Sequence, residues 1–362
     1  MYDIKEFAFV PPPYGGVSTY IKRLISRLNE LGIKTGGYYL PQCKEETLRK
    51  SEMFDEWRWM PTHLFFSRIF KYLHETKPYK VVHSHFSLEG MLYLWTIKIF
   101  GRKRIMITVH NSMVEDYVRH TNVLNRFFLN RMAHSMDVTW IAVSDQAKVS
   151  MKKLPMKFES EIHVIPAYIP LKNTSEFSLT SGLIRYIEKH DKIMVFYGHS
   201  FMKHAGKDIY GFEQTIRMYG SLNEKERNAC GLVFCIADAT EKDSIAKIRE
   251  LAKNLGVDNS IFWQIGAIEN MAALWQKTDV YIRPTSTDGD SVAVREALDM
   301  GVRVVASDVC PRPEKTIVYP YDDDEEFLAA VRSAIALGKT SVNTDETYFN
   351  QMLELYRKVL AS

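Results

Sequence analysis

Short apolar runs alternate with amphipathic segments along the whole chain, and this alternation predicts parallel β-sheets covered by helices on both faces. In the first half, strands are expected at residues 5–10, 38–40, 79–85, 104–109, 138–143 and 162–165, with helices at 17–31, 63–75, 88–100 and 120–134. In the second half, strands are expected at 192–197, 232–237, 261–265, 278–283 and 303–307, with helices at 209–219, 242–255, 269–276, 291–300 and 327–337. A last amphipathic helix is expected at 346–360.

The alternation is interrupted once, by a proline-containing segment at 166–170 followed by mixed polar residues at 171–190, which we interpret as a linker. A chain of 362 residues is also too long for one ordinary core. We therefore expect two Rossmann-like α/β domains, at residues 1–170 and 171–344, with a ligand site in the cleft between them.

Composition places the chain among soluble globular proteins, with 46% hydrophobic and 25% charged residues. The sequence has neither the long apolar run of a membrane helix nor, in residues 1–6, the start of a secretory signal, so we expect a cytoplasmic protein. The four cysteines, Cys43, Cys230, Cys235 and Cys310, lack the spacing of a metal site, and three of them are expected to be core thiols.

The net charge of +3 hides an asymmetry between the two halves. Residues 1–172 hold about 25 Lys and Arg against about 16 Asp and Glu, which leaves about 22 against about 28 for the rest. A basic first half could be attracted to an anionic surface, such as lipid headgroups, a lipid pyrophosphate or nucleic acid. The alternative is ordinary variation of surface charge.

Residues 278–301 carry the strongest chemical pattern. An apolar strand ends at Pro284, and a loop of small residues leads through Gly289, Asp290 and Ser291 into a helix near Val292. Free backbone N–H groups and the positive end of the helix dipole make such a junction suitable for an anion. Two acids flank it, Asp288 and Glu296, and acids beside an anion site indicate a hydroxylated group next to a phosphate. The combination indicates a nucleotide-sugar.

Three more stretches are candidates because they lie where a strand meets a helix. Gly15-Gly16 precedes the first helix, and adjacent glycines let a ligand approach the backbone, although a simple turn is the alternative. His85 and His110 end two strands, where parallel sheets bind ligands, whereas His83 is expected to be structural. The loop after residue 197 holds His199, Lys203 and Lys207, and we expect Lys207, at the helix entrance, to neutralise a pyrophosphate. A solvated surface loop is the alternative.

These motifs together resemble the GT-B glycosyltransferases, specifically the retaining enzymes of family 4, over nearly the whole chain. The resemblance rests on Gly15-Gly16-Val17, on Val81-Val82-His83-Ser84-His85, on Thr108-Val109-His110, on Val143-Ser144 and on Val164-Ile165-Pro166. Most specific is the pair Asp288 and Glu296, which resembles the family's E-x7-E element. The chain departs from the family pattern at Asp288, which replaces Glu, at His199, which replaces Arg, and at Ala167-Tyr168 in the linker.

The resemblance implies a GT-B fold and retaining transfer of a sugar from a nucleoside-diphosphate sugar, with UDP as the default carrier. It implies catalytic roles for His110, Lys207, Asp288 and Glu296, with Glu296 on the ribose, Asp288 on the donor sugar and His110 over that sugar. The remaining donor contacts would come from His199, Lys203, Gly266, Ile268, Gly289, Asp290, Ser291 and Val292, with Gly266 and Ile268 near the base. Gly15, Gly16 and His85 would bind the acceptor, and the helix at 345–362 would pack back on the first domain.

No metal or other cofactor is expected, since Lys207 and the loop amides can stabilise the leaving diphosphate and no DxD-like metal motif is identified in a strand-end context. The acidic run at 322–326 is expected to cap the following helix and not to bind metal. The implied acceptor is a glycan or a lipid-pyrophosphate-linked glycan of a bacterial surface polysaccharide, with possible contact with an anionic membrane at its inner face and no nucleic acid partner. Three alternatives stay open: a non-catalytic GT-B subunit that stabilises a partner transferase, a nucleotide-sugar epimerase and a glycan phosphorylase.

Overall fold

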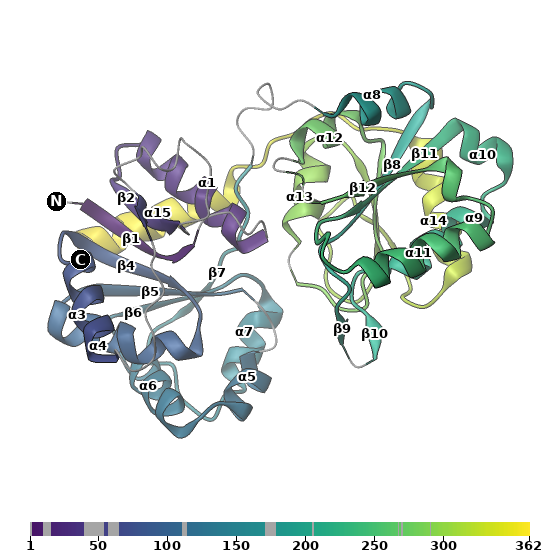
Figure 1. The fold of residues 1–362 in the computed structure, drawn as a ribbon. Coiled ribbons are helices and arrows are strands. Elements are labelled where there is room, and N and C mark those ends of the chain that lie inside the picture. The colour runs from purple at the N-terminus through teal and green to yellow at the C-terminus, as the bar shows by residue number, and fades with distance from the viewer. Residues whose placement is uncertain are drawn as a thin grey trace. The chain divides into compact units, whose positions relative to one another are not determined.

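The computed structural model describes residues 2–9, 16–39, 54–56, 65–110, 114–170, 179–204, 206–266, 268, 271–289 and 291–362. The chain forms two compact units. The first comprises residues 1–169 and 346–362, and the second comprises residues 170–345. Each unit has a parallel β-sheet with helices on both faces (Figure 1). This architecture confirms the predicted pair of Rossmann-like α/β folds.

The first unit has a seven-stranded sheet in the order β3-β2-β1-β4-β5-β6-β7. Its strands are β1 (Tyr2–Phe9), β2 (Thr35–Tyr39), β3 (Phe54–Glu56), β4 (Tyr79–His85), β5 (Arg104–Val109), β6 (Val138–Ala142) and β7 (Ile162–Val164). Its helices are α1 (Gly16–Glu30), α3 (Phe65–Thr76), η2 (Leu88–Gly90), α4 (Met91–Gly101), α5 (Val114–His120), α6 (Val123–Ala133), α7 (Asp145–Lys152) and α15 (Thr347–Ala361).

Alternation along these strands builds one apolar cluster on each face of the first sheet. Val81 and Met106 face a cluster that includes α1 and the carboxy-terminal helix α15. Their neighbours Val82 and Ile105 face the other cluster, which includes α4 and α6. Helix α15 therefore completes the core of the first unit, and it lies across strands that come from the opposite end of the chain (Figure 1).

The second unit has a six-stranded sheet in the order β12-β11-β8-β13-β14-β15. Its strands are β8 (Lys192–Gly198), β11 (Cys230–Ile236), β12 (Ile261–Ile265), β13 (Val280–Arg283), β14 (Arg303–Ser307) and β15 (Ile317–Tyr319), with a separate antiparallel hairpin of β9 (Lys203–His204) and β10 (Lys207–Asp208). Its helices are α8 (Ser181–Ile187), α9 (Phe212–Ser221), α10 (Glu224–Ala229), α11 (Lys242–Asn254), η3 (Asp258–Ser260), α12 (Ala272–Lys277), α13 (Val292–Asp299) and α14 (Asp324–Leu337).

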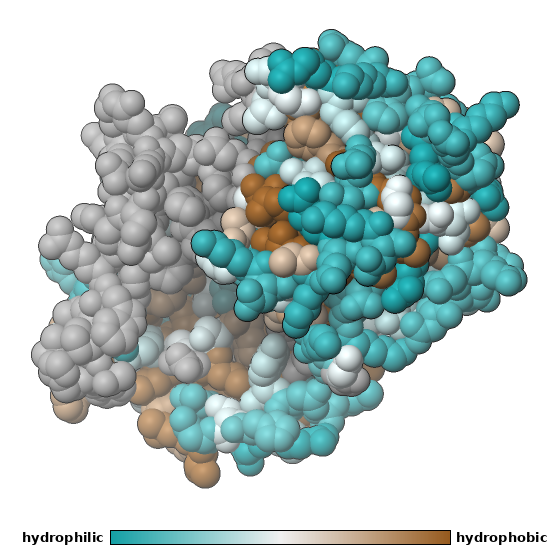
Figure 2. Space-filling view, turned by 45° about the vertical axis from the view of Figure 1, so that its right-hand side comes forward, coloured by the Kyte–Doolittle hydropathy of each residue, from teal (hydrophilic) through white to brown (hydrophobic). Residues whose placement is uncertain are grey.

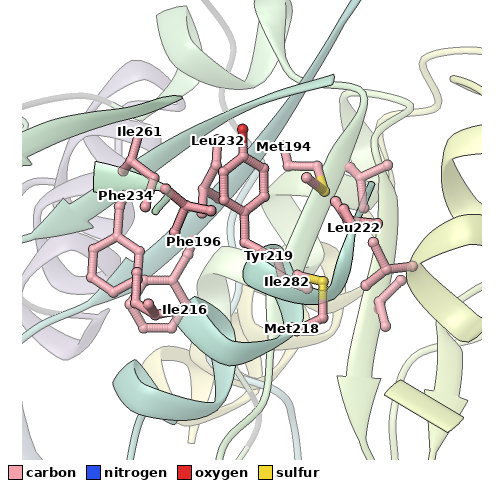
Figure 3. Packing of buried hydrophobic residues seen from close by; sticks show 14 of the residues in the cluster. Met194, Phe196, Ile216, Met218, Tyr219, Leu222, Leu232, Phe234, Ile261 and Ile282 are labelled. Carbon is pink, nitrogen blue, oxygen red and sulfur yellow. The ribbon is translucent and has the colours of Figure 1, made fainter. Parts of the chain in front are cut away.

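Aromatic side chains pack together in the buried cluster on one face of the second sheet. Phe196 of β8 and Phe234 of β11 stack with ring centroids 4.4 Å apart. Figure 3 shows these rings with Ile216 and Tyr219 of α9 in the same buried cluster. The thiols of Cys230 and Cys235 are buried in β11, so these cysteines are core residues as expected.

Several element boundaries differ from the predicted ones for local reasons. The helix expected at 120–134 is α6, which begins only at Val123, because Asn122 caps it by accepting a hydrogen bond from Asn125 N–H. The linker expected at 171–190 contains α8, which Thr180 caps in the same way. The helix expected from residue 209 begins only at Phe212, after Gly211 adopts φ +77°. Strand β15 and helix α10 have no counterpart among the predicted elements.

Candidate active site

The order of strands in the second unit marks the position of a ligand site. Chain connections run outward from β8 on one side and from β13 on the other, so the strand order reverses between these two strands. Ligands of open α/β sheets bind beyond the carboxyl ends of the strands at such a reversal. His199 follows β8 there, and the loop from Pro284 to Ser291 follows β13. The structure thus brings two of the predicted stretches to adjacent strand ends.

The helix after this loop has an open amino terminus. Ser291 occupies the N-cap of α13, but its side chain does not accept a hydrogen bond from the helix, and the first turn, beginning at Val292, contains no acid. Among the described residues, no side chain caps this turn, so its N–H groups keep their capacity to bind an anion. Gly289 adjoins open space, since a Cβ atom there would meet no atom within 4 Å. Asp290, also predicted to bind the donor, is outside the described residues.

Asp288 is the centre of a hydrogen-bonded cluster inside the same loop. Its carboxylate accepts from Arg283 Nε and Nη2 at 3.0 and 3.1 Å, and from Arg312 Nη1 at 2.7 Å. It also accepts from Thr285 Oγ1 and from its neighbour's amide, Gly289 N–H. The carboxylate predicted to hold sugar hydroxyls is thus already saturated by protein donors.

The cluster also fixes the charge of Asp288. Burial alone would raise the pKa of this carboxyl, but the guanidinium groups of Arg283 and Arg312 reverse the effect and lower the pKa to about 2. Arg283 and Arg312 are themselves almost fully buried, with side-chain exposures of 11% and 3%. The loop therefore contains an ion cluster that is shielded from solvent.

Glu296 lies one turn beyond the open end of α13 and is 5% exposed. The indole of Trp275, on α12, donates from Nε1 to Glu296 Oε2 at 3.1 Å. Because the indole N–H can only donate, it orients the carboxylate of Glu296 as an acceptor. Two adjacent helices therefore position the acid that was predicted to bind ribose.

The structure places Lys207 differently from the sequence prediction. It lies in β10 of the hairpin and not at the entrance of a helix, because α9 begins at Phe212. The amino terminus of α9 is already occupied by Asp208, whose carboxylate accepts from the N–H groups of Tyr210 and Phe212 at 2.9 and 2.6 Å. Lys207 Nζ pairs with Asp322 at 2.5 Å, and both side chains are more than half exposed. Lys203 is an exposed residue of β9 in the same hairpin.

Three further predicted donor contacts lie at strand ends of the second sheet. His199 has a buried Nδ1 that finds no hydrogen-bond partner within the described part of the chain. Gly266 follows β12 with φ +106°, a conformation that favours glycine. Ile268 packs against the buried cluster of β8, β13 and α13.

In the first unit the strand order reverses between β1 and β4. His85 ends β4, and His110 directly follows β5, so both lie at carboxyl ends of strands beside this reversal. Gly16 is the exposed first residue of α1, which follows β1, whereas Gly15 is outside the described residues. The structure therefore brings the two predicted histidines together at one edge of the sheet.

These histidines form a hydrogen-bonded row that begins at Glu6 of β1. Glu6 Oε2 lies 2.9 Å from His85 Nε2, and His85 Nδ1 lies 2.7 Å from His110 Nε2. Both ring nitrogens of His85 are thus bound within the protein, and His85 is 4% exposed in its side chain. The predicted contact of His85 with an acceptor is not available as a direct hydrogen bond. His110, at the other end of the row from Glu6, is partly exposed.

A second set of contacts surrounds Glu6. His83 Nδ1 lies 3.2 Å from Glu6 Oε1 and 2.5 Å from the hydroxyl of Tyr356, while its Nε2 lies 2.7 Å from Thr108 Oγ1. Tyr356, on α15, donates to Glu6 Oε1 at 2.7 Å. Burial would raise the pKa of Glu6, but His83 and His85 hold it well below its usual range. Glu6 is therefore a buried carboxylate anion.

The sequence prediction missed five residues that organise these two sites: Glu6, Trp275, Arg283, Arg312 and Tyr356. Glu6 and Arg283 each carry a charge within an apolar strand, and a charge at an interior strand position is a signal that could have identified them. Trp275, Arg312 and Tyr356 reach their partners only through tertiary packing, so no local pattern marks them.

Among the described helices, none is both long and apolar enough to cross a membrane. The sequence model of glycosyltransferase family 4 matches residues 14–173, and that of the glycosyl transferases group 1 matches residues 204–336. A comparison with curated proteins finds no match.

Similar solved structures cover almost the whole chain at low identity. A sucrose-phosphate synthase from Thermosynechococcus elongatus is 15% identical with a TM-score of 0.71, and all of both chains is covered. A glycosyltransferase from Rickettsia africae is 13% identical with a TM-score of 0.71, covering 99% of this chain and 98% of the other. HepE from Anabaena, solved in complex with UDP-glucose, is 12% identical with a TM-score of 0.67, covering 92% of this chain and 90% of the other. The chain is a glycosyltransferase and belongs to the family 4 type of the GT-B fold.

Proposed function

We propose that the protein transfers a sugar from a nucleoside-diphosphate sugar, with UDP as the expected carrier, to a hydroxyl of a glycan or lipid-linked acceptor, with retention at the anomeric carbon. The observation that carries the proposal is the uncapped amino terminus of α13 at the strand-order reversal, with the buried acid Glu296 one turn away. An anion site beside a carboxylate fits a diphosphate joined to a hydroxylated ribose. HepE, a structural neighbour, has been solved with UDP and with UDP-glucose.

On the donor side, the N–H groups at the start of α13 would bind the diphosphate and stabilise the charge that develops as it leaves. Glu296, oriented by Trp275, would accept hydrogen bonds from the ribose. Lys207 would add positive charge by exchanging its exposed partner Asp322 for phosphate, because an exposed ion pair costs little to separate. We propose that these groups suffice without a metal ion.

Asp288 takes a modified role in this proposal. Its carboxylate is saturated by Arg283, Arg312, Thr285 and Gly289, so it would act by holding the loop in shape for the donor. The backbone of the same loop, at Gly289 and Ser291, would make the direct contacts.

On the acceptor side, a lipid-linked glycan fits the surface of the first unit. Helices α3, α4 and α6 form neighbouring parts of one helical layer, since α4 contacts both of the others. This layer exposes Phe66, Phe70, Ile99, Phe100, Val123, Leu124 and Phe127, with exposures from 46% to 81%. At the lower end of the first unit, hydrophobic surface lies beside hydrophilic surface (Figure 2). Apolar side chains beside Arg126 and Arg131 suit the interface of an anionic membrane. A bacterial surface polysaccharide is the acceptor class we propose.

A thermal-shift screen against a panel of nucleoside diphosphates tests the donor assignment. Only the true carrier should stabilise the protein strongly, by about 3 kcal/mol at a hundredfold excess over its dissociation constant. The stabilisation should be lost in Glu296→Gln and kept in Glu325→Gln, which changes an exposed acid of α14. A panel without any stabilising diphosphate would contradict the proposal. Sugar transfer by the purified protein alone then separates an enzyme from a non-catalytic subunit.

A further inference from the structure

The side chains of Glu6, His85 and His110 form one continuous hydrogen-bonded row, which a single contact with substrate would not require. Its three members come from neighbouring strands, since Glu6 of β1 pairs in register with His83 of β4, and His85 pairs with Thr108 of β5, two residues before His110. Glu6 is fully buried, whereas His85 and His110 are each partly exposed as residues, with 4% exposure of the His85 side chain. The direction of each hydrogen bond in this row can be worked out from Glu6 outward.

Glu6 is an anion, so it can only accept, and the proton of its bond with His85 must lie on His85 Nε2. Burial, followed by the electrostatic influence of His83, lowers the pKa of His85, so this ring is neutral near pH 7 and carries no second proton. His85 Nδ1 is therefore an acceptor. The proton of the next bond, 2.7 Å long, consequently lies on His110 Nε2.

Burial is also the main reason that the pKa of His110 is lowered well below its usual value, with further lowering by His85 and His83. A neutral His110 with its proton on Nε2 has a bare Nδ1. No hydrogen bond to this atom comes from the described part of the chain. Tyr20 of α1 packs edge-on against both rings, with centroids 6.1 Å from His85 and 6.0 Å from His110, and limits their rotation.

We infer that Glu6, acting through His85, is a positioning residue that selects the tautomer of His110 and so makes His110 Nδ1 a hydrogen-bond acceptor for the substrate. The site then favours a substrate group that donates a hydrogen bond, such as a sugar hydroxyl. It disfavours a carboxylate or a carbonyl oxygen at that point, because either would face a lone pair. This specificity rests on the proposed sugar transfer, whereas the tautomer itself does not.

A cation is the competing explanation for this cluster, since Glu6, His83 and His85 each offer an atom within 4.8 Å of the others. Hydrogen bonds already account for each of these atoms: Glu6 accepts from His85 and Tyr356, and His83 binds Tyr356 and Thr108. The two explanations differ in whether a chelator changes which imidazole nitrogens carry a proton.

The test is nitrogen NMR of the full-length protein labelled at its 11 histidines, without substrate, with His110 assigned from the signal lost in His110→Gln. We expect a protonated Nε2 and an unprotonated Nδ1 in His110 at pH 7, unchanged by dialysis against EDTA. In Glu6→Gln the amide can donate to His85 Nε2. This reverses the direction of each hydrogen bond in the row and moves the His110 proton to Nδ1. Thr108→Val, which removes a partner of His83 but none in the row, should keep the wild-type signature.

A proton on Nδ1 in the wild type, an unchanged tautomer in Glu6→Gln, or a signature that EDTA alters would each overturn the inference. Activity gives a second readout: kcat should fall at least about a hundredfold in Glu6→Gln, as expected when a histidine is held in the wrong tautomer. Glu6→Asp, which preserves the charge, should recover part of the loss. If the tautomer is as inferred and no donor is turned over, the proposed function fails and the positioning role stands.

Discussion

Arg312 donates from Nη1 to Asp288 Oδ2 across 2.7 Å, and this bond joins the segment after β14 to the loop after β13. Arg312 also donates to the carbonyl and hydroxyl oxygens of Ser307, so one guanidinium connects both segments. The acid that the resemblance assigns to the donor sugar is thus part of the framework of its own loop.

Asp288→Asn should therefore destabilise the second unit, because it leaves two buried arginines without a counter-charge. Loss of one partner of a buried ion pair costs about 3 to 5 kcal/mol. Chemical denaturation followed by tryptophan fluorescence would measure the change. Asp322→Asn, which removes the exposed partner of Lys207, is the control and should change stability by about 1 kcal/mol or less. Equal stabilities for the two variants would contradict the framework role.

The same cluster predicts a stability that depends on acid. The pKa of Asp288 is about 2 in the folded protein against an ordinary value of 3.8, so the folded state holds the proton more weakly than the unfolded state. The contribution, about 2 kcal/mol, is complete above the ordinary value and is lost as the pH falls toward 2. The stability difference between wild type and Asp288→Asn should shrink from pH 5 to pH 2. A constant difference would show that the charge of Asp288 is not responsible.

Trp275→Phe should weaken donor binding while the fold is kept. The variant removes the indole N–H that orients Glu296. We expect the Kd for the nucleoside diphosphate to rise about tenfold, in keeping with one lost hydrogen bond to a charged group. Trp263→Phe is the matched control, because Trp263 Nε1 has no partner in the described part of the chain. Isothermal titration of both variants would measure the Kd. Equal losses of affinity would show that Trp275 acts through packing and not by orienting Glu296.

Gly211→Ala should disturb the donor loop. A Cβ atom at Gly211 would lie 2.3 Å from the carbonyl oxygen of Pro284, and the residue has φ +77°. Gly256→Ala shares the conformational strain, with φ +69°, but meets no atom within 4 Å. The control should lose about 1 kcal/mol of stability, whereas Gly211→Ala should lose more and also bind donor more weakly. Unchanged donor binding in Gly211→Ala would show that the loop tolerates this displacement.

Val123→Ser should weaken binding to anionic vesicles if α6 lies at a membrane interface. Val123 is 81% exposed, so the change should leave the stability of the first unit almost intact. Val342→Ser, at a 65% exposed valine of the second unit, is the matched control. Sedimentation with phosphatidylglycerol vesicles, compared with phosphatidylcholine vesicles, would measure the difference. Equal binding by both variants would exclude α6 from the contact.

The fold could be predicted from the sequence because alternation and turn residues are local signals. Strands β4, β5, β12 and β14 have the predicted bounds, since each is an apolar run closed by polar or glycine residues. Helix α8 was predicted as linker because its residues are mixed, and the cap at Thr180 that begins it is a single side chain. The hairpin β9–β10 interrupts a segment that was predicted to enter a helix. Lys207 was therefore predicted at a helix entrance, whereas it lies in β10.

The site was only partly predictable, because its side chains act through partners far away in sequence. His110 and Glu296 could be identified from their positions after a strand and within a helix that follows a loop. Their orientation depends on Glu6 and Trp275, which are distant in the chain and carry no motif of their own. Asp288 could be located, but its two arginine partners, which change its role, could not.

The contact between Tyr356 and Glu6 joins residues 350 positions apart. On the ribosome, β1 emerges first, and the tyrosine that satisfies its buried carboxylate emerges only after the entire second unit has been made. Until then Glu6 lacks one of its donors and the face of the sheet that α15 covers stays open to water. The second unit is continuous in sequence and can complete its fold during synthesis, whereas the first unit must finish last, although its strands are made first.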